Sequence, residues 1–100
     1  MLNRFKNVTI RNSDPDMFYV YVIQSNTNGD IYVGFTTDLK NRFKLHNTGK
    51  VKSTKPNRPW ILIYYEAYKS KPDATIREKR LKIHVIKNGL SSRLGNSIIK

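Results

Sequence analysis

The chain has 100 residues, of which 38% are hydrophobic and none is cysteine, so it supports one modest core and excludes disulfides and thiolate metal sites. Its 19 lysines and arginines against 7 acidic residues give a net charge of +12, which attracts polyanions, nucleic acid first and an anionic membrane surface second. No run approaches the roughly 18 apolar residues of a membrane span, so we expect a cytoplasmic protein without a membrane partner. A basic soluble or ribosome-associated protein is the plain alternative.

The first segment, residues 1–16, shows no hydrophobic periodicity and ends in an Asp-Pro-Asp stretch that breaks regular structure. We expect a flexible N-terminal arm there, which could include a short strand around residues 8–10. The folded domain should span residues 17–100, with its core in residues 17–87.

Two runs rich in β-branched and aromatic residues, 17–23 and 31–35, flank the pair Asn28-Gly29. Because this pair tolerates the positive φ angles of a type I′ turn, the pattern predicts an antiparallel hairpin centred on it. In that register Ser25 faces Tyr32, Ile23 faces Gly34 and Tyr21 faces Thr36. Alternation then places four residues on one face of the sheet: Tyr19, Tyr21, Tyr32 and Gly34.

A short helix is predicted after the hairpin, capped by Thr37 or Asp38 and closed by Gly49. The spacing i, i+3, i+4 and i+7 puts one stripe on its inward face: Leu39, Arg42, Phe43 and His46. A histidine near a helix end is a partner of the helix dipole about as often as it is a ligand or proton carrier.

A basic polar loop and a third strand follow. The cations Lys52, Lys55 and Arg58 are solvated by default, and the total charge raises the expectation that they bind the DNA backbone. Residues 60–68 are long and apolar enough to form the central strand of the sheet.

The second helix should run from Lys71 to Lys87, with Ser70 as its N-cap. Glu78 shares a stripe with Ala74, Leu81 and Val85, while Ile76 and Ile83 form an opposite stripe, so the pattern leaves the buried face open. The predicted fold class is α/β: a small sandwich of a three-stranded antiparallel sheet flanked by helices.

Polar residues on inward faces need partners, and a shared polar cavity would supply them. A carboxylate such as Glu78 can hold a Mg²⁺-type ion, an arginine can neutralise a phosphate, and a phenol near a cation can activate water. A simple salt bridge between Arg42 and Glu78 is the alternative.

At these residues the sequence resembles the GIY-YIG nuclease superfamily, in particular its small stand-alone single-domain branch and the N-terminal catalytic domain of the excision-repair nuclease UvrC. The first signature triad is Tyr19-Val20-Tyr21 and the second is Tyr32-Val33-Gly34. Arg42 matches the family's catalytic arginine, His46 a histidine that several members carry, and Glu78, within "REKRLK", the metal-binding glutamate.

The resemblance implies a divalent-metal-dependent DNA endonuclease that uses Mg²⁺ or Mn²⁺. It implies catalytic roles for Tyr21 as base, Tyr32 as its helper, Arg42 and His46, with Glu78 as metal ligand. Gly34 would leave space for a phosphate, and Tyr19 would pack at the cleft wall. Low sequence specificity is expected, on branched or single-stranded DNA in repair, recombination or processing, with a possible protein partner supplying specificity.

Two positions depart from the family pattern. Phe35 stands where UvrC-like members have a lysine, which favours the alternative of a catalytically weak or inactive nucleic-acid-binding module. The family's late asparagine has two competing positions, Asn88 and Asn96.

Overall fold

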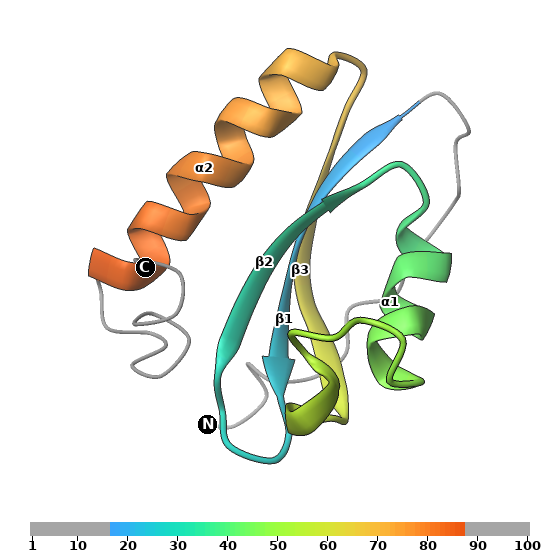
Figure 1. Cartoon of the computed structure of the whole chain (residues 1–100). Helices are drawn as coiled ribbons and strands as arrows, with labels where there is room; N and C mark the ends of the chain where they lie inside the picture. The colour runs from blue at the N-terminus through green and yellow to red at the C-terminus, as the bar shows by residue number, and fades with distance from the viewer. Residues whose placement is uncertain (1–16, 88–100) are drawn as a thin grey trace.

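The computed structural model describes residues 17–87, so the expected arm at 1–16, its strand at 8–10 and both late asparagines lie outside the described residues. The elements in chain order are β1 (Phe18–Ser25), β2 (Ile31–Thr36), α1 (Leu39–Asn47), a short 3₁₀ helix (Lys55–Asn57), β3 (Trp60–Tyr68) and α2 (Lys71–Lys87) (Figure 1). The strands form an antiparallel sheet, which confirms the predicted fold class.

The strand order is β2-β1-β3, so β1 is central and the prediction that residues 60–68 form the central strand is wrong. The physical reason is burial on both faces. Residues 19–23 of β1 are at most 7% exposed, whereas Tyr64 in β3 is 42% exposed. A strand that carries an exposed aromatic and a carboxylate at its far end fits an edge better than a centre.

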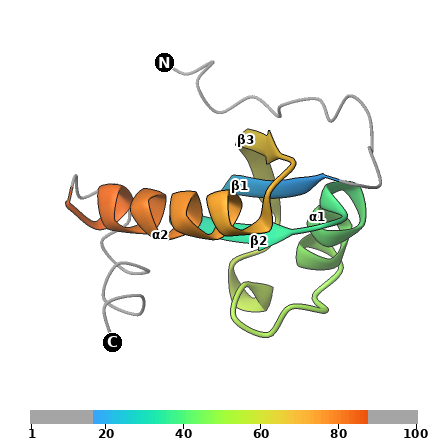
Figure 2. The ribbon, with the colours of Figure 1, turned by 90° about the horizontal axis from the view of Figure 1, so that it is seen from above.

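The two helices lie on opposite sides of the sheet (Figures 1 and 2). The α2 face buries Val20, Val22, Ile31 and Val33 of the sheet against Ala74, Leu81 and Val85 of the helix. The α1 face buries Tyr19, Tyr21, Ile23, Trp60 and Leu62 together with Leu39. Alternation along β1 thus sends its tyrosines towards α1 and its valines towards α2.

The hairpin register differs by two residues from the predicted one. Tyr21 lies opposite Gly34, Ile23 opposite Tyr32 and Tyr19 opposite Thr36. Because a shift of two preserves the alternation, the predicted face survives the error, and the tyrosines and Gly34 still share one side.

The turn explains this difference. The hairpin closes through the Ser25 N–H and the Asp30 carbonyl at 2.8 Å, which leaves a four-residue loop. The Ser25 hydroxyl accepts hydrogen bonds from the backbone N–H groups of Thr27 and Asn28, each at 3.1 Å. Gly29 has a φ of 81° and Asn28 does not have a positive φ, so the type I′ turn, which needs both, is not formed.

A register irregularity opposite the pair Val22/Ile23 divides β3 into two halves. Before it, Trp60 and Leu62 belong to the α1 face. After it, Glu66 pairs with Val20 and Tyr68 with Phe18, so both point towards α2. The extra residue therefore reverses the alternation and puts polar side chains under α2.

The helix boundaries follow the predicted caps. The Asp38 side chain accepts the Asn41 N–H at 3.2 Å, and the Ser70 hydroxyl accepts the Asp73 N–H at 3.3 Å. The sequence pattern left the buried face of α2 open. Ile76 and Ile83 are 50% and 56% exposed, so the stripe that contains Glu78 is the one that faces the sheet. No helix within residues 17–87 is long and apolar enough to cross a membrane.

Candidate active site

Tyr21 lies at the centre of the sheet and is fully buried. Its partner across the hairpin is Gly34, and a Cβ atom at that position would overlap the Tyr21 ring and hydroxyl. The sequence-based expectation that Gly34 leaves space for a phosphate is therefore corrected. The space beside this glycine holds the phenol of Tyr21, which the tight pairing of β1 and β2 brings across it.

A buried chain of hydrogen bonds leads away from this phenol. The Tyr21 hydroxyl lies 2.7 Å from Nε2 of His46, and Nδ1 of the same ring lies 2.7 Å from Oγ1 of Thr54. His46 and Thr54 are both fully buried. His46 is held on the inward face of α1, as its helical spacing predicted, whereas Thr54 comes from the loop before β3 and no sequence pattern marked it.

The environment keeps both rings of this chain neutral. Burial, together with the nearby charge of Arg42, lowers the pKa of His46 from 6.5 to about 4. Burial also raises the pKa of Tyr21 well above its ordinary value of 10, with Arg42 opposing that shift. At neutral pH the pair is therefore a phenol and a neutral imidazole.

Arg42 lies beside the two motif phenols. Interaction of its guanidinium with the Tyr21 hydroxyl is the largest cause of a raised Arg42 pKa, and Tyr32 contributes in the same direction. The half-buried Tyr32 ring meets His46 edge-on at 5.1 Å between centroids and Trp60 at 6.4 Å. Both tyrosines, the arginine and the histidine are therefore gathered at one place on the α1 face.

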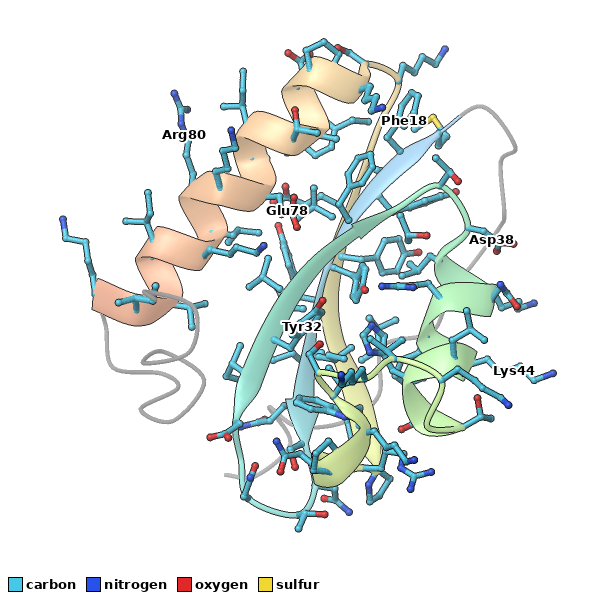
Figure 3. The ribbon with its side chains drawn as sticks, viewed as in Figure 1. Phe18, Tyr32, Asp38, Lys44, Glu78 and Arg80 are labelled. Carbon is cyan, nitrogen blue, oxygen red and sulfur yellow. The ribbon has the colours of Figure 1, made fainter. Side chains whose placement is uncertain are left out.

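Glu78 lies on α2, on the other side of the sheet from this cluster (Figure 1). Figure 3 shows it on the side of α2 that faces the strands, whereas Arg80 points outwards. Its side chain is 19% exposed and pairs with Lys82 at 3.3 Å. The negative charge of Glu78 is one of the causes that raise the pKa of Tyr21, so the two groups are electrostatically linked. Within the described chain no salt bridge joins it to Arg42.

The donor set at Glu78 fits a hard divalent cation with an open coordination shell. Among residues 17–87 no cluster of three or more His, Cys, Asp or Glu side chains could enclose a metal ion. Mg²⁺ is commonly held in proteins by one or two carboxylates, with water and substrate phosphate oxygens completing its octahedron. One half-buried carboxylate with an exchangeable lysine partner matches that mode.

The remaining sequence-predicted residues lie apart from this cluster. Lys52, Lys55 and Arg58 are exposed in the loop between α1 and β3, and Arg58 Nε donates to the Lys55 carbonyl at 3.0 Å. Tyr19 is 3% exposed and packs edge-on against the Tyr65 ring, as expected of a packing residue. Phe35 stacks on Phe18 under α2, so its side chain points away from the phenols.

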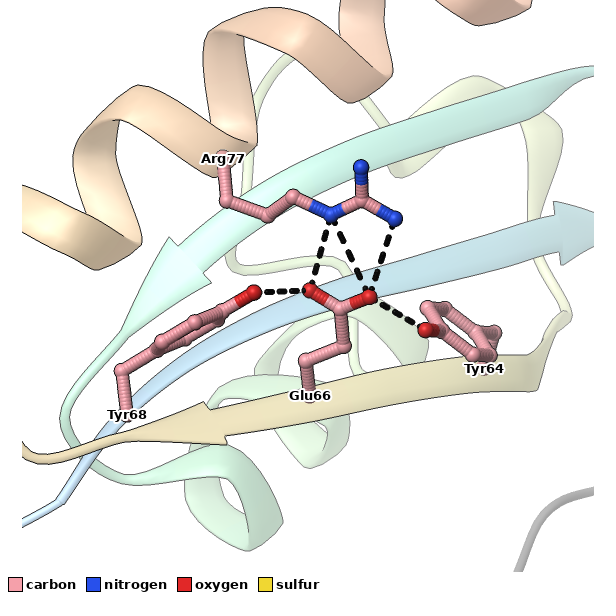
Figure 4. A network of polar contacts seen from close by, with 4 residues as sticks. All are labelled: Tyr64, Glu66, Tyr68 and Arg77. Atoms are coloured by element: carbon pink, nitrogen blue, oxygen red, sulfur yellow. Dashed lines mark hydrogen bonds and ion pairs between the residues drawn. The ribbon is translucent and has the colours of Figure 1, made fainter.

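A second polar cluster lies under α2 and was missed by sequence reasoning. Glu66 accepts hydrogen bonds from Tyr64, Tyr68 and Arg77 (Figure 4). Arg77, more than the two phenols, lowers the Glu66 pKa to about 2. A lone carboxylate in an aromatic strand was the signal that could have found this cluster. The side of the sheet on which Glu66 lies depends on the bulge in β3, however, and the sequence did not reveal that bulge.

A surface pocket of about 340 Å³ adjoins this second cluster, lined by Tyr68, Asp73, Ile76, Arg77 and Arg80. It contains none of the motif residues. The Arg77 guanidinium in its wall is already bound by Glu66, and Asp73 adds a negative charge, so the pocket is a poor phosphate site. The motif residues Tyr32, Arg42 and His46 gather around Tyr21 instead.

Comparison with known proteins gives consistent matches. Residues 17–90 match the family model described as the GIY-YIG catalytic domain. A UPF0213 protein of Staphylococcus haemolyticus (strain JCSC1435) is 42% identical over 65 residues, which are 64% of this chain and 78% of the relative. One from Streptococcus agalactiae serotype V (strain ATCC BAA-611 / 2603 V/R) is 43% identical over 65 residues, 64% and 73% of the two chains. No solved structure matched the chain.

Proposed function

Because the chain belongs to the GIY-YIG family, a family of nucleases, we propose that it is a divalent-metal-dependent DNA endonuclease of low sequence specificity. The proposed reaction is hydrolysis of a phosphodiester bond, in DNA repair, recombination or processing. Mg²⁺ or Mn²⁺ is the proposed cofactor and Glu78 its ligand. The names of the relatives state no activity, so the proposal rests on the family and on the geometry of this chain.

The observation that carries the proposal is the arrangement around the Tyr21 hydroxyl. This buried phenol is bound to a neutral imidazole 2.7 Å away and has a guanidinium beside it. A group that must take a proton from water needs an acceptor for its own proton, and Nε2 of His46 is in place for that.

The proposed chemistry divides among the chain's own residues. The Tyr21 proton passes to Nε2 of His46, and the phenolate takes a proton from a water molecule that attacks phosphorus. His46 then releases its extra proton to solvent and returns to the neutral imidazole. A new P–O bond forms while the bond to the leaving deoxyribose oxygen breaks, and solvent protonates that oxygen. Arg42 neutralises the charge that grows on the phosphate oxygens, with Tyr32 at its side.

The charge of Glu78 opposes ionisation of Tyr21 in the protein alone. A divalent cation held there would reverse that local charge and favour the phenolate. Lys82, which pairs with Glu78 at 3.3 Å and is 37% exposed, can swing into solvent to leave the carboxylate free. This arrangement supports a metal requirement for the chemical step.

DNA is the proposed substrate, held by phosphate contacts. The net charge of +12 supports binding without sequence readout, and exposed Lys52, Lys55 and Arg58 are proposed as backbone contacts. Branched or single-stranded DNA is the preferred form in this proposal, and a protein partner could add specificity.

The test is a cleavage panel with branched, single-stranded and duplex DNA in Mg²⁺, Mn²⁺ or EDTA. We expect cleavage in the presence of either metal, none in EDTA, and a loss of at least about 100-fold in Glu78→Gln. Asp73→Asn is the matched control because it removes a carboxylate from an exposed position of the same helix. It should cut like the wild type.

The alternative is a nucleic-acid-binding module without activity. Phe35 suggested it in the sequence, but its side chain lies under α2, away from the phenols. Metal-independent DNA binding with no cleavage of any substrate would favour this module over the nuclease. Cleavage undiminished in Glu78→Gln would remove the proposed metal ligand.

A further inference from the structure

Thr54 occupies a position that the proposed nuclease chemistry does not yet use. Its side chain is fully buried beside His46, with Oγ1 2.7 Å from the ring Nδ1. The same hydroxyl lies 3.3 Å from the Val51 carbonyl. A buried hydroxyl against a histidine decides which ring nitrogen carries the proton, because that nitrogen must face an acceptor.

Trp60 holds Thr54 and His46 in one frame. Its indole Nε1–H donates to the Thr54 carbonyl at 2.9 Å. Its backbone N–H donates to Oδ1 of Asn47 at 2.6 Å, and the Asn47 amide returns a bond to the Trp60 carbonyl at 3.0 Å. Asn47 follows His46 on α1. Trp60 therefore holds both residues of the Nδ1 contact in place, His46 through Asn47 and Thr54 through its carbonyl.

The hydrogen-bond inventory around Tyr21 selects the tautomer. Arg42 carries donor groups only, so as a neighbour of the Tyr21 hydroxyl it offers no acceptor for the Tyr21 proton. If Nε2 of His46 also carried a proton, the buried hydroxyl would face two donors, and its own proton would need another acceptor. With Nε2 unprotonated, the Tyr21 O–H donates to it across 2.7 Å and each group is satisfied.

The other end of the chain agrees with this choice. When Nε2 is unprotonated, Nδ1 carries the ring proton and donates it in a hydrogen bond to Oγ1 of Thr54. The threonine proton then points to the Val51 carbonyl at 3.3 Å, an oxygen that also accepts hydrogen bonds from the N–H groups of Thr54 and Lys55. We propose that Thr54 is a positioning residue that holds His46 as the Nδ1–H tautomer, so that Nε2 is the acceptor for the Tyr21 proton.

The inference rests on the proposed function for its consequence in catalysis, but the tautomer is a property of the protein alone. When the Tyr21 proton moves to Nε2, the imidazolium has two N–H groups, one facing the phenolate and the other facing Thr54. Arg42 and Tyr32 are the other titratable groups against the ring, and neither supplies an acceptor to Nδ1 among the contacts described. Thr54 therefore stabilises the transferred state as well as the resting one.

The experiment compares Thr54→Val, Thr54→Ser and wild type by long-range ¹H–¹⁵N correlation spectra of the histidine rings at pH 7. The wild type should show His46 with Nδ1 protonated and Nε2 bare, and Thr54→Ser should keep that pattern. Thr54→Val keeps the shape of the side chain but removes the acceptor, so the tautomer should shift. Thr75→Val, which removes a hydroxyl bonded to the Pro72 carbonyl on α2, is the matched control.

Cleavage kinetics provide the second readout. We expect Thr54→Val to lower kcat by about 10-fold to 100-fold with little change in KM, and Thr54→Ser to restore it. An Nε2–H tautomer in the wild type overturns the proposal, as does an unchanged ring or an unchanged kcat in Thr54→Val. If Thr54→Val does not fold, the wild-type and Thr54→Ser spectra decide. Absence of cleavage by the wild type would contradict the proposed nuclease function, whereas the tautomer would still be tested by the spectra.

Discussion

The two faces of the sheet carry polar clusters of opposite character. Under α1, Tyr21, His46 and Thr54 form a fully buried chain of neutral groups. Under α2, Glu66 is ionised and bound by Arg77 and two phenols, with 19% of its side chain exposed. Both clusters use tyrosine hydroxyls, which donate to an ionised carboxylate under α2 and lie against a neutral imidazole under α1.

The proposed function assigns chemistry to the first cluster and a structural role to the second. Glu66 has its donors saturated and its pKa lowered to about 2, so its charge stays in place across the physiological range. His46 is also held in one state in that range, because a pKa of about 4 keeps its imidazole neutral. A shifted pKa occurs on both faces, so it does not by itself identify the reacting groups.

The largest expected effect comes from removing one hydroxyl on each face. Tyr21→Phe removes the proposed base, so cleavage should fall by about 100-fold to 10,000-fold. Tyr64→Phe removes a donor to Glu66 on a side chain that is 42% exposed, and should leave kcat unchanged. Initial cleavage rates of both variants, corrected for folded fraction by circular dichroism, check this; equal losses would contradict the division between the faces.

The next effect is a dependence of stability on pH. The folded pKa of His46 is about 4 against 6.5 in the unfolded chain, so the unfolded state takes up the proton first. The free energy of unfolding should fall as pH drops from about 6.5 to about 4, by up to about 3 kcal/mol. Urea titrations of wild type and His46→Gln measure it as the difference between the two curves.

The matched control for that measurement is His84→Gln, which replaces an exposed histidine on α2. It should keep the wild-type slope between pH 4 and 6.5. A slope that also persists in His46→Gln would assign the loss to other groups and remove His46 as its source.

A smaller effect is expected at Gly34. An alanine there would press against the Tyr21 ring, so Gly34→Ala should destabilise the fold by about 1–3 kcal/mol and also displace the phenol from Nε2 of His46. Gly29→Ala, at a φ of 81° in the open hairpin loop, should cost about 1 kcal/mol but spare cleavage. Thermal unfolding and cleavage by the folded fraction distinguish the two.

The smallest effect belongs to the ionised cluster. Arg77→Met should lower stability by about 1 kcal/mol at neutral pH, because the Arg77 side chain is 39% exposed and solvent screens the pair. It should raise the Glu66 pKa towards 4.5, so the variant loses less stability than the wild type as pH falls from about 4.5 to about 2. A kcat change larger than about 10-fold would show that this cluster also serves the chemistry.

Much of the site was predictable because periodicity is a local property. The helical spacing of Arg42 and His46, the strand alternation of Tyr21 and Tyr32, and the stripe containing Glu78 each follow from one element at a time. The face shared by the tyrosines even survived a register error of two residues, since alternation repeats at that interval.

What escaped prediction depended on contacts between distant segments. The sequence by itself determined the elements, the inward faces of β1, β2 and α1, and the family, because hydrophobic period and motif spacing can be read along the chain. Only the tertiary structure decided that Tyr21 fills the space over Gly34, that Thr54 meets His46, and that a bulge sends Glu66 to Arg77. These contacts join residues on different elements, and their register and packing emerge only when the sheet and both helices are assembled.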